Sequence, residues 1–324
     1  MRRFAGVLFA VLSAFAFAAT ASAQGYPNRT ITIIVPYPAG GPTDTTAREI
    51  ANSLSAKLKQ SVIVENVTGG GTTVATNKVV RATPDGYMVL LHNSQISANV
   101  TLYKNLPFDT EKDLTPVILV NKNPLVLVGR GTLAPNNLSD LLALMKKQTL
   151  KAAIPGYGAT GHLTTTLVAQ EAKVSIDQIP YRGAAPAMTD LLGGHVDLFF
   201  GTPQSVVPQV TAGKLKAYAI TSKEKNPQLP TAESLVTALG PKLDIVFWQG
   251  LFVPAATPEP VIKTLNAAVQ EVMADPALLK RWETEGFEPF PKGQLSTAAA
   301  RSFMHSEVER WGEVIRNNNI KVEQ

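Results

Sequence analysis

The sequence predicts an α/β protein built from two lobes. Short apolar segments alternate with longer amphipathic ones, and this order of strands and helices forms sheets that are mixed but mostly parallel. The alternation begins near residue 31 and restarts near residue 139. A leader of 23 residues leaves 301 of the 324 residues, which suits two domains of about 150 residues each.

Residues 1–23 have the composition of a secretory signal peptide. Arg2 and Arg3 precede an apolar stretch at 4–19, and 21-ASA-23 supplies the small residues of a cleavage site. A membrane anchor is the alternative interpretation, but the apolar stretch is short for a bilayer span of about 20 residues. We therefore predict cleavage after Ala23 and a periplasmic location.

The first round of elements follows from apolar periodicity and from Gly and Pro breaks. We expect strands at 31–37, 62–66 and 87–93, and helices at 44–60 and from the glycines 69–71 through residue 80. In the helix at 44–60, Ile50, Leu54 and Leu58 share one face. The segment 117–130 carries two apolar runs that Pro124 separates.

The second round repeats this order and ends in a helical tail. Strands are expected at 151–156, 177–181, 196–201, 215–221 and 245–254, and helices at 139–148, 162–173, 185–194, 204–214, 261–273, 277–285 and 302–318. We expect the tail to pack on the first lobe. The predicted division is residues 24–123 plus 246–324 for lobe 1 and residues 124–245 for lobe 2, joined by a hinge.

Composition excludes several classes of function. The formal net charge of +5 falls to +3 when Arg2 and Arg3 leave with the leader, and no basic run supports nucleic-acid binding. The absence of cysteine excludes disulfides, thiol catalysis and Cys-ligated zinc. We predict no cofactor, no metal site and a monomer.

Two loops share one design. The stretches 35-VPYPAGGPTD-44 and 154-IPGYGATGHLT-164 each run from a strand through Pro, an aromatic residue and a Gly-rich turn into a helix. Such a turn places free N–H groups and the positive end of a helix dipole at the carboxyl end of a strand, which favours an anion. Ordinary tight βα turns are the alternative. With one loop in each predicted lobe, we expect them to hold one carboxylate together.

The second loop also contains 156-GYGATG-161, a literal dinucleotide-binding pattern. The motif lies in mid-chain, and Asp177 begins its strand instead of ending it, as a ribose-binding acid would. An exported chain also has no access to the nicotinamide pool. We therefore do not expect dinucleotide binding.

No catalytic motif stands out. The chain has no H-E-x-x-H and no G-x-S-x-G pattern, although a dispersed Ser-His-Asp triad remains open, so a secreted hydrolase is the alternative function. Asp44 is expected to cap its helix. His162 could donate to an anion or close its turn. His195 is expected in a turn, and His305 on the surface of the tail helix.

Other side chains have two interpretations each. Tyr37, Tyr157 and Tyr181 lie near strand ends beside glycines, where they could line a cleft. Phe247 and Trp248 could stack on a carbon skeleton or pack in a core. Arg182 could clamp a second carboxylate or form a surface ion pair.

These stretches together resemble the Bug family, the extracytoplasmic solute-binding proteins of tripartite tricarboxylate transporters. The resemblance covers the whole mature chain and rests on 35-VPYPAGGPTDTTAR-48, 65-ENVTGGGTTVATNKVVRATPDGY-87, 101-TLYKNLPFDTEKDLTPV-117, 180-PYRGAAPAMTDLLGGHVD-197 and 248-WQGLFVPAATPEPV-261. Ala39 stands where the family often has Gly, and Val67-Thr68-Gly69 where it often has Arg-Pro-Gly.

The resemblance implies a type II periplasmic-binding-protein fold whose two lobes close on a carboxylate ligand, together with a membrane permease as partner. We expect that ligand to be a dicarboxylate or an aromatic carboxylate. It also implies that the two Gly-rich loops grip the carboxylate and that variable residues meet the distal end of the ligand, for which Asn93, Ser94 and Thr202 are the candidates. With the candidates from the residues themselves, the expected ligand-binding set is Tyr37, Pro38, Ala39, Gly40, Gly41, Thr43, Asp44, Asn93, Ser94, Gly158, Ala159, Thr160, Gly161, His162, Arg182, Thr202 and Phe247.

Overall fold

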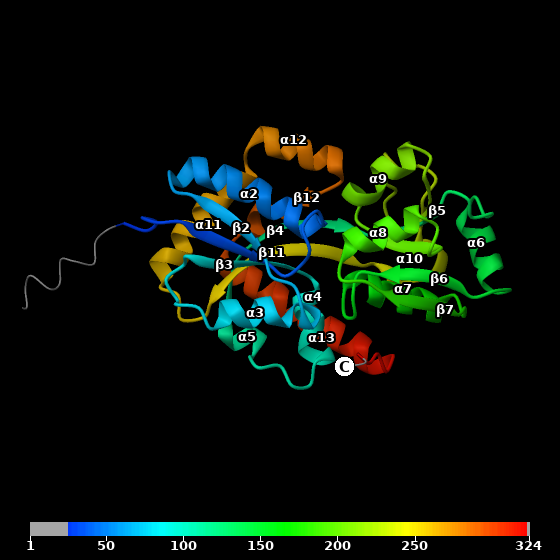
Figure 1. Ribbon diagram of the computed structural model, residues 1–324, viewed down its shortest axis with the longest axis horizontal. Helices are drawn as coiled ribbons and strands as arrows, with labels where there is room; N and C mark the ends of the chain where they lie inside the picture. The colour runs from blue at the N-terminus through cyan, green and yellow to red at the C-terminus, as the bar shows by residue number, and fades with distance from the viewer. Residues whose placement is uncertain (1–24, 323–324) are drawn as a thin grey trace, which may run out of the picture.

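The computed structural model describes residues 25–322 and shows two lobes, each built on a six-stranded mixed sheet (Figure 1). The predicted signal peptide, with its cleavage site after Ala23, lies outside the described residues. Among the helices of the described part, none is both long and apolar enough to cross a membrane.

The first sheet takes its strands from both ends of the described chain. Its order is β12-β4-β11-β3-β1-β2. The strands are β1 (Ile31–Val35), β2 (Val62–Asn66), β3 (Met88–Asn93), β4 (Leu114–Pro124), β11 (Val246–Pro254) and β12 (Glu288–Pro289). Helices α2 (Pro42–Leu58), α11 (Glu259–Met273) and α12 (Pro276–Glu285) lie on one face, and α3 (Thr73–Val80), α4 (Gln95–Leu102), α5 (Thr110–Asp113) and α13 (Thr297–Asn317) on the other (Figure 1).

The second sheet is contiguous in sequence. Its order is β10-β9-β5-β8-β6-β7. The strands are β5 (Val126–Arg130), β6 (Leu150–Ile154), β7 (Ile176–Pro180), β8 (Leu198–Gly201), β9 (Leu215–Ile220) and β10 (Glu233–Ser234). Helices α6 (Leu138–Met145) and α7 (Thr160–Glu171) share one hydrophobic cluster, and α8 (Ala184–Leu192) and α9 (Pro203–Thr211) share another. The short α10 (Leu235–Leu239) follows β10.

The strands that follow a crossing between the lobes are antiparallel to their neighbours. The strands β1, β2 and β3 run parallel, whereas β11 is antiparallel to its neighbours β3 and β4. In the second sheet β6, β7 and β8 run parallel, and β5 is antiparallel to β8 and β9. The strands β5 and β11 each follow directly after the chain crosses from the other lobe. Each therefore begins at the inter-lobe edge of its sheet and is antiparallel to neighbouring strands, because those strands end at that edge.

One buried hydroxyl ties the two crossings together. Leu125 lies between β4 and β5, and Ile245 directly precedes β11. The Thr221 hydroxyl accepts a hydrogen bond from Leu125 N at 2.8 Å and donates one to Ile245 O at 2.6 Å. Thr221 is fully buried. We propose that these crossings form the hinge predicted near residues 124 and 245.

Replacing Thr221 with valine should lower the free energy of unfolding by about 1–3 kcal/mol, because it leaves a buried N–H and a buried C=O without their partner. Thr257 is a matched control, since its hydroxyl is buried but has no hydrogen-bond partner. Thr257→Val should therefore be close to neutral. Urea denaturation of the two variants measures the difference, and equal costs would contradict the role given to Thr221.

Three features of the first lobe differ from the prediction: the start of α2, the start of α3 and the presence of α4. Helix α2 begins at Pro42, with Gly41 as its N-cap, so Asp44 occupies the third helical position and is not the cap. Proline lacks an N–H and suits the first helical position, which allows this earlier start. The glycines near residue 70 form a 3₁₀ turn (Gly70–Thr72) before α3. Helix α4 has no counterpart among the predicted elements.

The tail helix α13 contacts both lobes instead of the first alone. It packs against α4 and β4 of the first lobe. Towards its end, Arg310 donates to Asp244 O of the predicted second lobe. Trp311 and Ile315 join a hydrophobic cluster with members from both lobes, among them Ala98 of α4 and Leu127 of β5. The predicted packing on the first lobe is therefore incomplete.

Candidate functional site

The cavity between the lobes is lined by both Gly-rich loops. It encloses about 50 Å³. The first lobe contributes Tyr37, Pro38, Gly41, Pro42, Thr43 and Asn93, and the second lobe contributes Pro155, Ala159, Thr160, Gly161, Ala184, Phe199, Phe200, Gly201 and Thr202. Leu125 and Phe247, beside the two crossings, complete the lining. Among the described residues, no Asp, Glu, His, Lys or Arg side chain lines this cavity.

Four helices begin at this cavity, and none of them has a side-chain cap. The N-cap residues are Gly41 for α2, Ala159 for α7, Gly183 for α8 and Thr202 for α9, and no side chain accepts from the first N–H groups of these helices. Elsewhere in the described chain, α3, α4 and α11 also lack a side-chain cap, whereas five helices are capped by Asp109, Asn137, Ser234, Asp275 and Ser296. The first N–H groups of a helix have no partner within the helix. Uncapped ends directed at one cavity therefore favour an anion there.

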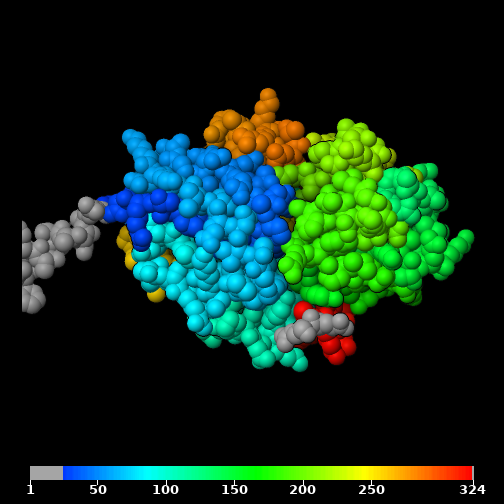
Figure 2. Space-filling model, in the orientation of Figure 1, coloured from blue at the N-terminus to red at the C-terminus, as the bar shows by residue number. Residues whose placement is uncertain are grey.

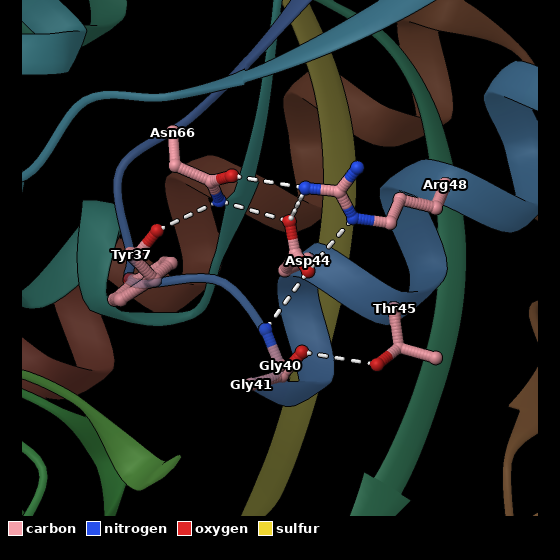
Figure 3. Close-up of polar contacts among 7 residues, drawn as sticks. All are labelled: Tyr37, Gly40, Gly41, Asp44, Thr45, Arg48 and Asn66. Carbon is pink, nitrogen blue, oxygen red and sulfur yellow. Dashed lines mark hydrogen bonds and ion pairs between the residues drawn. The ribbon is translucent and has the colours of Figure 1, made fainter. Parts of the chain in front are cut away.

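Asp44 shapes the first loop without touching the cavity (Figure 3). Its carboxylate accepts from Gly40 N at 2.9 Å, from Arg48 at 2.9 and 3.0 Å, and from Asn66 Nδ2 at 2.9 Å. The same Asn66 amide donates to Tyr37 O at 2.9 Å. Burial favours a raised pKa for Asp44, but the hydrogen bonds from Arg48, Gly40 and Asn66 outweigh it and lower this pKa. The charge of Asp44 is thus neutralised by Arg48 and serves to hold the loop.

The second loop is closed by His162. The Gly158 N–H donates to Nδ1 of His162 at 3.0 Å, so the ring closes its turn, which was one of the two roles left open by the sequence. His162 is buried, and burial lowers its pKa to about 4. The ring is therefore neutral at neutral pH.

His162 should make the protein less stable in mild acid. The unfolded chain takes up the proton below about pH 6.5, whereas the folded ring takes it up only near pH 4. The stability that it contributes is therefore complete above about pH 6.5 and is lost as the pH falls towards 4. His162→Asn keeps an acceptor for Gly158 N but cannot be protonated. Between pH 7 and pH 5 the variant should lose about 2 kcal/mol less stability than the wild type, measured by urea denaturation. Equal losses would contradict this assignment.

The lobes are closed on one another around the cavity. The Ser94 and Thr160 hydroxyls lie 2.6 Å apart, and Gln95 Nε2 donates to Tyr157 O at 3.0 Å. On the side of α12, Gln204 Nε2 donates to Glu285 Oε2 at 2.9 Å. On the face seen in Figure 2, the blue and cyan surface of the first lobe meets the green surface of the second along their boundary.

The structure brings ten of the seventeen predicted residues to the cavity: Tyr37, Pro38, Gly41, Thr43, Asn93, Ala159, Thr160, Gly161, Thr202 and Phe247. The other seven lie elsewhere. Ala39 and Gly40 are exposed, Asp44 and His162 brace their loops, and Ser94 and Gly158 lie at the contact between the lobes. Arg182 is exposed and lines an outer groove, where it makes no ion pair with any described residue.

The other three histidines do not line the cavity, and two of them, His195 and His305, lie where the sequence predicted. His195 is exposed in a turn, and His305 is exposed on α13 beside Glu111. His92 is fully buried beneath the first loop, where burial lowers its pKa to about 3. Trp248 is also fully buried and donates to Glu307 at 2.9 Å, so it belongs to the core and not to the cavity.

Sequence reasoning did not select seven lining residues: Pro42, Leu125, Pro155, Ala184, Phe199, Phe200 and Gly201. For most of them a signal was present. Phe199, Phe200 and Gly201 end a predicted strand, and Ala184 begins the helix after Gly183, which are positions where ligands bind in α/β sheets. Leu125 has no local signal, because only the crossing between the lobes brings it to the cavity.

The comparisons with known proteins agree with this geometry. Residues 46–320 match the family model of the tripartite tricarboxylate transporter family receptor. The chain belongs to this receptor family. Its expected fold is confirmed as a two-lobed α/β periplasmic-binding-protein fold with two mixed sheets. The receptors of this family bind solutes and are not enzymes, so the hydrolase alternative is not retained.

Three solved structures are similar to this receptor. The periplasmic binding protein BugD is 35% identical, with a TM-score of 0.88, over 92% of this chain and 100% of that chain. MatC from Rhodopseudomonas palustris with bound malate is 32% identical, with a TM-score of 0.85, over 90% of this chain and 100% of that chain. A second R. palustris protein, solved with adipate, is 28% identical, with a TM-score of 0.86, over 92% and 99% of the two chains.

Proposed function

We propose that this receptor captures a small carboxylate between its lobes and delivers it to the membrane permease of a tripartite tricarboxylate transporter. The observation that carries the proposal is the meeting of uncapped helix N-termini at a cavity that no charged side chain of residues 25–322 lines. Malate in MatC and adipate in the second R. palustris protein support the same ligand chemistry. We further propose that the receptor acts as a periplasmic monomer after removal of residues 1–23.

The grip on one carboxylate is assigned to α2 and α7. The Asn93 amide donates to the Thr43 hydroxyl at 3.2 Å, and the next residue, Ser94, contacts Thr160 at 2.6 Å. This chain of contacts places the starts of α2 and α7 side by side when the lobes close. Because the Thr43 oxygen accepts from Asn93, its own hydrogen remains available for a ligand oxygen.

The energies are sufficient for a micromolar affinity. Each helix N-terminus contributes about 0.3–1 kcal/mol towards an exposed charge and up to about 2 kcal/mol towards a partly buried one. Each hydrogen bond to a charged group adds about 1.5–3 kcal/mol. Since a micromolar dissociation constant corresponds to about 8 kcal/mol, two helix ends and a few N–H donors reach this range together with the apolar lining.

A carboxylate panel tests the proposal. The protein is unfolded and refolded to remove any co-purified ligand, and its melting temperature is then measured with each acid. An acid at about 100 times its Kd should stabilise the fold by about 2.7 kcal/mol and raise the melting temperature by roughly 5 °C. The neutral amide of each acid is the matched control and should have no effect. If no acid acts, or if each amide acts as well as its acid, the proposal is wrong.

A further inference from the structure

Resting on the proposed function, we infer that the ligand carries a single carboxylate on an apolar body, unlike the dicarboxylates malate and adipate bound by its relatives. The inference comes from the difference between two parts of the cavity lining. One part presents backbone N–H groups, and the other presents hydrocarbon.

The polar part of the lining is built by three helix starts. Those of α2 and α7 are linked through Asn93 and Ser94, as described above. The start of α8 joins them, because a Cβ built at Gly183 would lie 2.8 Å from Cδ of Pro38 in the first loop. The three N-termini therefore lie around one part of the cavity, and a single carboxylate bound there can accept from their free N–H groups.

The rest of the lining is largely apolar. It includes Leu125, Phe199, Phe200 and Phe247, and each is buried. The start of α9 is a weaker donor than that of α2, although both begin with a proline that has no N–H. In α9 the Ser205 N–H already donates to Thr202 O at 2.9 Å, which leaves Gln204 N as the donor at this helix start. Thr202 is the polar side chain beside it, and its hydroxyl lies 3.3 Å from Ser205 Oγ.

A second carboxylate would have no cationic side chain to pair with. None of the described Lys and Arg side chains lines the cavity, and Arg182 lines the outer groove, which has its own lining and shares only Tyr37 and Pro155 with the cavity. Burying an ionised carboxylate without a partner costs far more free energy than contact with apolar side chains contributes. The same apolar wall stabilises a hydrocarbon body by about 25 cal/mol per Å² of buried apolar surface.

Isothermal titration calorimetry with matched acids tests the inference. Butyrate and succinate have the same carbon chain, and hexanoate and adipate form a second pair, with benzoate and malate added to widen the range. In each pair the monocarboxylate should bind at least tenfold more tightly. Succinate, malate or adipate binding as tightly as the monocarboxylates would overturn the inference and leave the proposed function intact. A protein that responds to none of the acids would contradict the proposed function itself.

A pair of variants locates the apolar wall. Phe247→Leu should lower the affinity for the monocarboxylate that binds most tightly by about tenfold. The affinity for acetate, which lacks an extended apolar body, should fall less than threefold. Phe252→Leu is the matched control, since Phe252 lies on the same strand but is buried in the core of the first lobe. It should change neither affinity more than twofold. Equal losses for both acids in Phe247→Leu would contradict an apolar body at this wall.

Discussion

Replacing Gly41 with leucine should abolish ligand binding while the protein still folds. Gly41 is buried and lines the cavity, and a Cβ built on it would meet only Pro38 O, at 3.6 Å. Its backbone is extended, with φ −82° and ψ 167°, so a larger residue is accepted without strain. The leucine side chain then has free space only in the cavity, which encloses about 50 Å³. We expect the Kd to rise at least 100-fold, or about 2.7 kcal/mol.

The fold should tolerate the same change. Glycine is a better N-cap than leucine, so Gly41→Leu should cost about 1 kcal/mol of stability and no more. Gly293→Leu is the matched control, because Gly293 has nothing within 4 Å of a built Cβ and lies far from the cavity lining. Calorimetry on both variants separates the effects. Retained affinity in Gly41→Leu would exclude the first loop from the ligand site.

Replacing Gly158 with alanine should prevent the lobes from closing. A Cβ at this position would lie 2.7 Å from Cδ1 of Leu102 and 3.1 Å from Oδ1 of Asn99, both on α4 of the first lobe. Because both contacts cross between the lobes, separating the lobes relieves the clash, so we expect the open form to gain population and the apparent affinity to fall in proportion. We expect at least a tenfold loss of affinity, together with a smaller decrease in radius of gyration on ligand addition, measured by small-angle X-ray scattering.

The strain of the glycine backbone itself must be separated from this clash. Gly158 has φ +79°, where alanine costs about 1–2 kcal/mol. Gly194 has φ +76° but nothing within 4 Å of a built Cβ, so Gly194→Ala carries the same strain without an inter-lobe contact. The control should lose stability and keep its affinity. An equal loss of affinity in both variants would show that strain, and not closure, is responsible.

Together these two variants assign different roles to two glycines. Gly41 provides space for the ligand, whereas Gly158 provides space for the other lobe. The distinction matters because both lie in Gly-rich loops of the same design, and the sequence predicted the same role for both. Only the position of α4 against Gly158 separates them.

The sequence determined the α/β class, the two rounds of strands and helices, and the two loops that begin helices at the ends of β1 and β6. These features are local. Apolar periodicity, proline and glycine act within a few residues of one another, so they can be read in order along the chain. The succession of motifs also indicated the receptor family, which the comparisons show.

Tertiary structure alone decided which residues meet. Leu125 and Phe247 lie more than a hundred positions apart, yet both line the cavity because the chain crosses between the lobes twice. Arg182, next to a strand end in the sequence, faces an outer groove instead. The α4 helix, which periodicity did not reveal, and its N-cap residue supply Gln95 and Ser94 to the closed contact. The physical reason is that local patterns set the elements, whereas the lining of a site between lobes depends on how two separately packed cores close on each other.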